Sequence, residues 1–122
     1  MKIIEAINHV DEVKPNNYSQ TEKIRWLSTL DGTIKAEIID NYEGAESISF
    51  EPYTEDSLLR ELLVPHPYDE VYIRWLEAQI DYANGEYGKY NNSITMYNTA
   101  YSAFVRYYNK MHKPIAKNFT HF

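Results

Sequence analysis

The sequence contains no cysteine and only four glycines. Without cysteine there is no disulfide framework, no thiolate metal ligand and no cysteine nucleophile. No apolar run approaches the roughly 18 residues that a membrane-spanning helix needs, and the first residues lack the apolar core of a signal peptide. We therefore expect a protein that is made in a cytosol and has no membrane partner.

Catalytic motifs are lacking as well. The sequence has no glycine-rich phosphate loop, no G-x-S-x-G elbow and no H-E-x-x-H pair, and its four histidines are scattered. Glu77 and Asp81 are four residues apart on one predicted helix face, where we interpret them as solvated side chains. We expect a protein that is not an enzyme and binds neither a metal nor a cofactor.

Acidic residues are almost absent from one end of the chain, although the net charge is -6. Residues 1–61 hold 13 acidic and 6 basic residues, whereas residues 62–122 hold 5 and 6. No acidic residue follows Glu86, and the cations beyond it are Lys89, Arg106, Lys110, Lys113 and Lys117. The net charge argues against a dedicated nucleic-acid binder, but it permits a local basic strip near a polyanion. Identical subunits with such asymmetry can pack acidic half against basic half.

The first half of the chain has two helical patterns. Apolar residues at spacings of four and three predict a helix over 3–13. Ser19 and Glu22 have the spacing of a capping box, and the apolar face that follows predicts a helix of about six turns, ending near Tyr42. Gly32 interrupts this helical pattern and predicts either a kink or a close contact with another helix across the missing side chain.

The second half is predicted to contain a long helix pair. Residues 43–67 break the helical periodicity. Ile48 and Phe50 alternate with serine and glutamate, and we expect a short β-hairpin or two extended pieces around 46–64. Over 68–111 a 4-3 alternation of apolar and tyrosine positions is unbroken, yet one helix there would be about 66 Å long, too long for this domain. We predict two antiparallel helices with a break between 84 and 93. The fold class is therefore a mainly α, small helical bundle, with one domain over 1–112 and a tail over 113–122.

Tyrosine is the overrepresented residue. Nine of the 12 tyrosines lie between Tyr68 and Tyr108. A large ring with a polar hydroxyl suits a surface that is buried when subunits meet, although rings on the helix seam would equally suit the core of the helix pair. We predict a subunit interface formed by Tyr72, Tyr82, Tyr87, Tyr90, Tyr97, Tyr101 and Tyr107.

The predicted tail alternates apolar residues with polar and basic ones. Its apolar side chains would be costly to leave in water. We expect it to dock either on another chain as an extended arm or on its own subunit. The residues predicted to make this contact are Lys113, Ile115, Lys117, Phe119 and Phe122.

Several stretches taken together resemble a known family. The stretches are Ile4-Glu5-Ala6, Val10-Asp11-Glu12, Lys14-Pro15-Asn16, Lys23-Ile24-Arg25-Trp26-Leu27-Ser28, Leu30-Asp31-Gly32, Leu62-Leu63-Val64-Pro65, Pro67-Tyr68-Asp69-Glu70, Leu76-Glu77-Ala78-Gln79-Ile80-Asp81-Tyr82, Asn84-Gly85-Glu86-Tyr87, Tyr90-Asn91-Asn92-Ser93 and Tyr108-Asn109. They are similar to stretches of the small head-tail connector, or adaptor, proteins of tailed phages and prophages of Gram-positive bacteria. The likeness covers nearly the whole chain, but its motifs are structural and not catalytic.

The resemblance implies a structural protein of the virion that is made in the bacterial host cytoplasm. Such subunits form a ring, commonly of about twelve copies, on the portal protein. The ring extends the channel through which packaged DNA passes and presents a platform for the next neck protein, or stopper. Under this hypothesis Lys89, Arg106 and Lys110 touch DNA or an acidic neighbour, and the tail docks on the portal. The alternative is a small prophage-encoded adaptor or regulatory module that binds one protein as a monomer or dimer.

Overall fold

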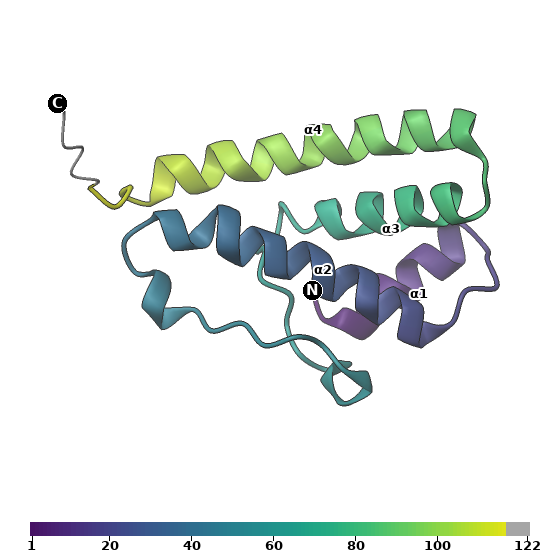
Figure 1. Ribbon diagram of the computed structural model, residues 1–122, viewed down its shortest axis with the longest axis horizontal. Coiled ribbons are helices and arrows are strands. Elements are labelled where there is room, and N and C mark those ends of the chain that lie inside the picture. Colours follow the sequence, from purple (N-terminus) through teal and green to yellow (C-terminus); the bar gives the residue numbers. More distant parts are fainter. Residues whose placement is uncertain (117–122) are drawn as a thin grey trace, which may run out of the picture.

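The protein is a bundle of four α-helices. The computed structural model describes residues 1–116, and over this range the helices are α1 (Ile3–Val13), α2 (Gln20–Glu37), α3 (Glu70–Ala83) and α4 (Tyr87–Met111) (Figure 1). Three short 3-10 helices, η1 (Ile39–Asn41), η2 (Ala45–Ser47) and η3 (Glu55–Ser57), lie between α2 and α3. The described part of the chain contains no β-strand, only two isolated bridges. The predicted mainly α fold class is confirmed.

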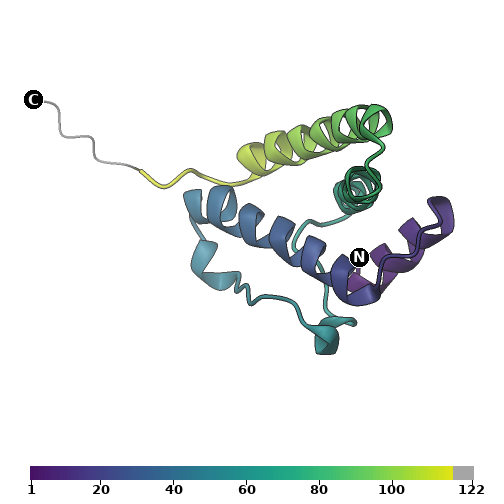
Figure 2. The same ribbon diagram turned by 45° about the vertical axis from the view of Figure 1, so that its right-hand side comes forward.

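Helix α3 is the centre of the bundle. It contacts α1, α2 and α4, and it lies between α4 and the layer formed by α1 and α2 (Figure 2). All sides of α3 are therefore covered by protein over much of its length. The core residues that are essentially inaccessible to solvent come from all four helices and include Ile3, Ile7, Val10, Leu27, Ile34, Val71, Leu76, Ile80 and Phe104.

Helix α2 begins where the sequence predicts. Ser19 is its N-cap, and the Ser19 hydroxyl accepts a 3.1 Å hydrogen bond from the backbone N-H of Glu22. The Glu22 carboxylate pairs with Arg25 instead of completing a capping box. The helix ends at Glu37, earlier than predicted, and the chain tightens into η1 before it reaches Tyr42.

The close contact predicted at Gly32 is present, but its partner is not a helix. A Cβ atom at this position would lie 3.3 Å from Cε1 of Phe50, in the segment that follows α2. Helix α2 continues through Gly32 without a break. The missing side chain thus allows the Phe50 ring to pack close to the helix backbone.

The β-hairpin predicted around 46–64 is wrong, and the alternative of extended pieces is correct. The segment consists of extended stretches joined by η2 and η3. Its end pairs with the first residues of the chain: the N-H groups of Ile3 and Ile4 donate to the carbonyls of Arg60 and Leu58 at 3.0 and 2.9 Å. The apolar alternation that suggested two paired strands instead serves packing of one extended chain against α2.

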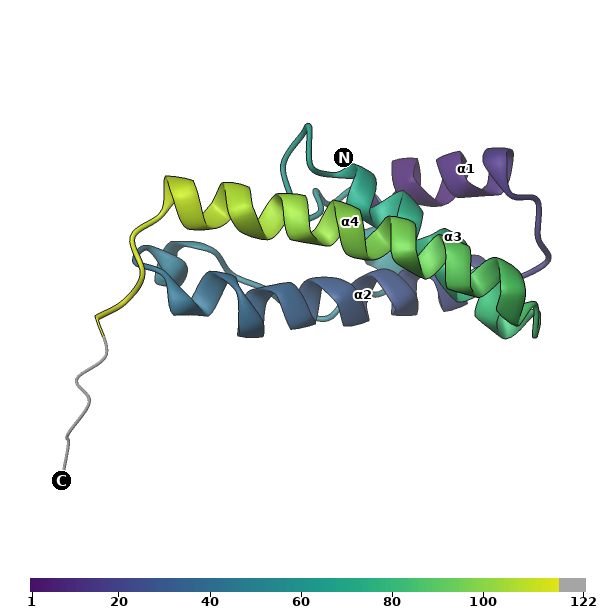
Figure 3. The ribbon, with the colours of Figure 1, turned by 90° about the horizontal axis from the view of Figure 1, so that it is seen from above.

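The antiparallel helix pair is confirmed. Gly85, with φ of 72°, makes the turn, so the break lies at the start of the interval predicted for it. Residues 91–93, at the other end of that interval, lie inside α4. At 1.5 Å per residue α4 is about 37 Å long and α3 about 21 Å, so the C-terminal part of α4 extends beyond α3 (Figure 3). None of the helices described is long and apolar enough to cross a membrane.

Candidate functional site

The tyrosines predicted to form an interface do not share one surface. Tyr72 is fully buried, so its assignment to a subunit interface is wrong. Its hydroxyl donates a 2.6 Å hydrogen bond to Oδ1 of Asp31 and accepts one of 2.7 Å from the N-H of Val64. The 4-3 alternation in the sequence marks only the face of α3 that meets α4. Tyr72 lies outside this face, but because α3 also packs on α2, its side chain is still in the core.

Asp31 is the buried partner that sequence reasoning missed. Its Oδ2 accepts hydrogen bonds from the Tyr53 hydroxyl and, at 3.0 Å, from the N-H of Leu63. Burial raises the pKa of Asp31, although these hydrogen bonds oppose the shift. Burial also raises the pKa of Tyr53 and of Tyr72, and the nearby Asp31 charge adds to both shifts. Since both carboxylate oxygens are satisfied by the protein, we interpret this cluster as structural.

The seam tyrosines in the middle of α4 belong to the helix pair itself. Tyr97 packs on the ring of Trp75 with 5.0 Å between centroids, and Trp75 donates a 2.8 Å hydrogen bond from Nε1 to the carbonyl of Trp26. Tyr101 packs beside Tyr97 at 5.7 Å, and both are half-buried. Burial raises the pKa of Tyr97. These two rings pack between the helices of the pair, which is the alternative to a subunit interface that the sequence left open.

Tyrosine is exposed at the turn between α3 and α4. The side chains of Tyr82 and Tyr87 are 57% and 60% exposed. Tyr82 makes edge-on contacts with Tyr87 and Tyr90, with centroids 5.7 and 5.2 Å apart. A cluster of exposed aromatic rings is a feature of protein-binding surfaces. For these three tyrosines the interface stays a prediction.

A second aromatic pair lies near the other end of α4, beside two cations. The rings of Tyr68 and Tyr107 stack at 4.5 Å, and with Arg106 and Lys110 they line a pocket of about 290 Å³. Arg106 and Lys110 are exposed, and neither makes an ion pair with any residue in 1–116. Lys89, by contrast, is paired with Glu86 at 2.6 Å. We call Arg106, Lys110 and the Tyr68–Tyr107 stack the basic edge.

The segment 43–61 forms an acidic edge on the other side of the molecule. Its single cation, Arg60, lies 5.1 Å above the ring of Tyr53. Its exposed carboxylates that lack an ion pair within the described range are Glu43, Glu46, Glu51, Glu55 and Asp56. In Figures 1 and 2, α4 runs along the top and this segment along the bottom. The charge asymmetry of the sequence is thus a spatial separation of charge.

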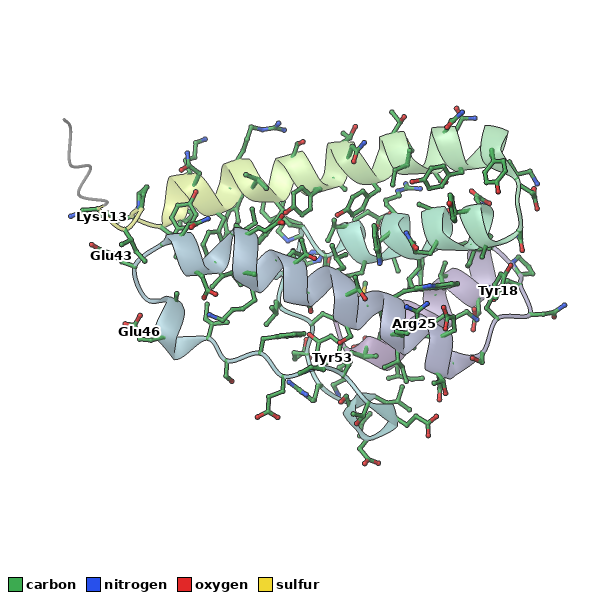
Figure 4. The ribbon with its side chains drawn as sticks, viewed as in Figure 1. Tyr18, Arg25, Glu43, Glu46, Tyr53 and Lys113 are labelled. Atoms are coloured by element: carbon green, nitrogen blue, oxygen red, sulfur yellow. The ribbon has the colours of Figure 1, made fainter. Side chains whose placement is uncertain are left out.

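The start of the predicted tail pairs with its own subunit. The carbonyl of Lys113 accepts a 2.8 Å hydrogen bond from the N-H of Glu43, and Ile115 donates one of 3.0 Å to the carbonyl of Asn41. Figure 4 shows Lys113 beside Glu43. The side chains of Lys113 and Ile115 are exposed. The other predicted docking residues, Lys117, Phe119 and Phe122, lie outside the described residues.

The carboxylates of Glu77 and Asp81 are not the solvated pair that the sequence suggested. Asp81 is only 2% exposed and accepts a 2.7 Å hydrogen bond from Nζ of Lys14, while its Oδ2 has no hydrogen-bond partner among residues 1–116. Glu77 pairs with Arg74 at 3.1 Å. The chain beyond α1 brings Lys14 over α3, a contact that helical spacing cannot reveal. Residues 1–116 contain no cluster of three acidic or histidine side chains that could hold a metal.

A groove runs between α2 and the segment 50–55. It has a volume of about 660 Å³ and is lined mainly by hydroxyl-bearing and apolar side chains. Arg25 and Tyr53, labelled in Figure 4, belong to its walls. The Arg25 guanidinium is already paired with Glu22. On the wall of the groove the Thr21 hydroxyl donates a 2.5 Å hydrogen bond to Oε1 of Glu55.

In comparisons with known proteins, no family model, no curated protein and no solved structure matches this chain. The resemblance to head-tail connectors therefore depends on the sequence stretches alone.

Proposed function

We propose that this chain is a head-tail connector subunit, a structural virion protein that forms a ring on the portal vertex. The observation that carries the proposal is the placement of unlike charges on opposite edges of one small helical subunit. When two copies meet through unlike surfaces, the resulting pair still has one free surface of each kind. Further copies can therefore add through the same contact, and the assembly closes into a ring when the rotation from copy to copy allows it. A subunit of this kind acts through its shape and needs no catalytic residue.

The assembled ring would extend the DNA channel and present a platform for the next neck protein. Its partners are further copies of the same chain, the portal protein, the neck or stopper protein and the DNA in the channel. We place the protein in the host cytoplasm before assembly and in the virion afterwards. The buried titratable group with the most hydrogen bonds, Asp31, is engaged in holding the fold together, which supports a role without catalysis.

A second candidate function is favoured by the exposed cluster at the α3–α4 turn. Tyr82 and Tyr87 offer one compact aromatic surface, which would suit a prophage-encoded adaptor or regulatory module that binds one protein as a monomer or dimer. Such a module has no need of the two charged edges. The variant Tyr82→Ser/Tyr87→Ser should abolish partner binding by the module, whereas charge reversal at the edges should not.

Co-sedimentation with portal rings tests the proposed function. The portal protein encoded in the same genome would be mixed with the full chain and with a chain that ends at Ala116, which retains the hydrogen bonds made by Lys113 and Ile115. We expect the full chain to sediment with the portal and the shortened chain to remain in solution with an unchanged circular dichroism spectrum. If the full chain does not sediment with the portal, the connector function is wrong. If both chains sediment equally, only the role of the tail is wrong.

A further inference from the structure

We propose that copies of this chain dock head to tail, with the acidic edge of one copy seated on the basic edge of the next. The inference rests on the proposed function in that it requires self-assembly, and it goes further by naming the two surfaces that meet. The acidic edge is the segment 43–61, and the basic edge consists of Arg106, Lys110 and the Tyr68–Tyr107 stack.

The basic edge is built to receive anionic side chains. Helix α4 carries no acidic residue. Arg106 and Lys110 are four residues apart, so they are neighbours on one face of the helix, about 6 Å apart at Cβ. They border a pocket whose other walls include the stacked rings of Tyr68 and Tyr107. A carboxylate entering this pocket would meet two cations over an aromatic surface that excludes water on one side.

The acidic edge has the complementary composition. The segment 43–61 holds six acidic residues and one arginine, and that arginine lies over Tyr53. Glu46 and Glu51 are exposed, and each is without a hydrogen bond or ion pair from its side chain within the described structure. Carboxylates gathered in this way repel one another in the isolated subunit, and a cationic partner removes that repulsion.

The charge pattern favours a second copy of the chain over DNA as the occupant. DNA phosphates would satisfy Arg106 and Lys110 but would leave the acidic segment 43–61 of the same subunit without a cationic partner. A neighbouring copy satisfies both edges at once. The acidic segment starts at Glu43, beside Lys113 just beyond the end of α4, and then runs along the side of the bundle opposite α4 (Figures 1 and 2), so each copy can use both edges simultaneously. The contact is therefore heterologous and propagates from copy to copy.

Two charge-reversed variants test this docking. The first, Arg106→Glu/Lys110→Glu, places carboxylates on both edges. The second, Glu46→Lys/Glu51→Lys, places lysines on both edges and leaves the segment 43–61 with four acidic and three basic residues. All four side chains are exposed, so thermal unfolding should match the wild type. Under conditions in which the wild-type chain assembles, alone or on portal rings, each variant alone should associate at least about tenfold more weakly, because like charges then face each other. An equimolar mixture of the two variants should assemble again, since every contact can then pair unlike edges.

Lys89→Glu is the control, because it reverses a cation of the same helix at the opposite end of α4, outside the basic edge. Its assembly should equal that of the wild type. The proposal is overturned if the first variant assembles normally, if Lys89→Glu is equally defective, or if the mixture fails to recover. Loss of binding to a short DNA duplex, with self-assembly unaffected, would assign the basic edge to DNA instead. A wild-type chain that stays monomeric both alone and with the portal would contradict the proposed function itself.

Discussion

The hydroxyl of Tyr72 donates a 2.6 Å hydrogen bond to Oδ1 of Asp31, joining α3 to α2 inside the core. The other oxygen of Asp31 holds the intervening segment through the Tyr53 hydroxyl and the N-H of Leu63. One buried carboxylate thus fixes the position of the chain on both sides of η3. The acidic edge is therefore presented by a segment whose path depends on this cluster.

Tyr72→Phe should destabilise the protein by about 1–3 kcal/mol, because it removes the hydrogen bond to Asp31 and leaves the buried N-H of Val64 without a partner. Urea unfolding measures this loss. Tyr87→Phe is the control: the Tyr87 side chain is 60% exposed, so its loss should stay within about 0.5 kcal/mol. Equal free energies of unfolding for the two variants would show that the buried hydrogen bonds contribute nothing.

The pKa of Asp31 predicts a pH dependence of stability. Burial raises this pKa in the folded state above its value in the unfolded chain, about 3.9. The folded protein therefore holds the proton more tightly, and the associated stability is fully present below about pH 4 and lost as the pH rises through the folded pKa. Relative to Asp31→Asn, which cannot titrate, the wild type should lose stability over this range. If the wild type instead becomes more stable relative to Asp31→Asn as the pH rises, the hydrogen bonds to Asp31 have a larger effect on its pKa than burial has.

Alkaline pH should unfold the protein through its buried tyrosines. The pKa values of Tyr53, Tyr72 and Tyr97 are raised by burial, so these phenols stay protonated in the folded state at a pH at which the unfolded chain ionises. Stability is fully present below about pH 10 and falls above it, by up to about 1.4 kcal/mol per pH unit for each group. Tyrosinate absorbance followed together with circular dichroism should show these groups ionising only as the helices melt. Ionisation of all 12 tyrosines before any loss of helix would contradict this prediction.

Lys14→Met should cost about 3 kcal/mol, because it leaves the buried Asp81 carboxylate without its cation. Lys14→Met/Asp81→Leu should recover most of this loss, since the buried charge is then removed as well. Lys89→Met provides the comparison: its pair with Glu86 is exposed, so the change should be below about 1 kcal/mol. Thermal or urea unfolding distinguishes these cases, and a double variant as unstable as the single one would indicate a packing defect instead.

Helical periodicity in the sequence predicts the helices and the antiparallel pair well, because one apolar face per helix follows from burial. Periodicity cannot show that a helix is covered on several sides, so it placed Tyr72 in an interface although α3 is the central helix. It also could not show that the alternation at Ile48 and Phe50 serves packing on α2. Both errors concern contacts between residues distant in the chain.

For the candidate site, residue counts revealed the charge asymmetry but not which charges are unpaired. Lys89, Arg106 and Lys110 are equivalent in the sequence, yet only Lys89 has an acidic residue one helical turn away, Glu86, which neutralises it. The stack of Tyr68 on Tyr107 joins the start of α3 to the end of α4 and has no local signal. The partner of the basic edge is therefore a question for assembly experiments.

The number of copies bound to one portal ring decides whether this chain is a ring-forming connector subunit. Cryo-electron microscopy or mass photometry of portal rings saturated with this chain would measure it. We predict a closed ring of about twelve copies around an open channel. A single copy or a dimer on the portal, or no bound copies at all, would contradict the assignment as a connector subunit.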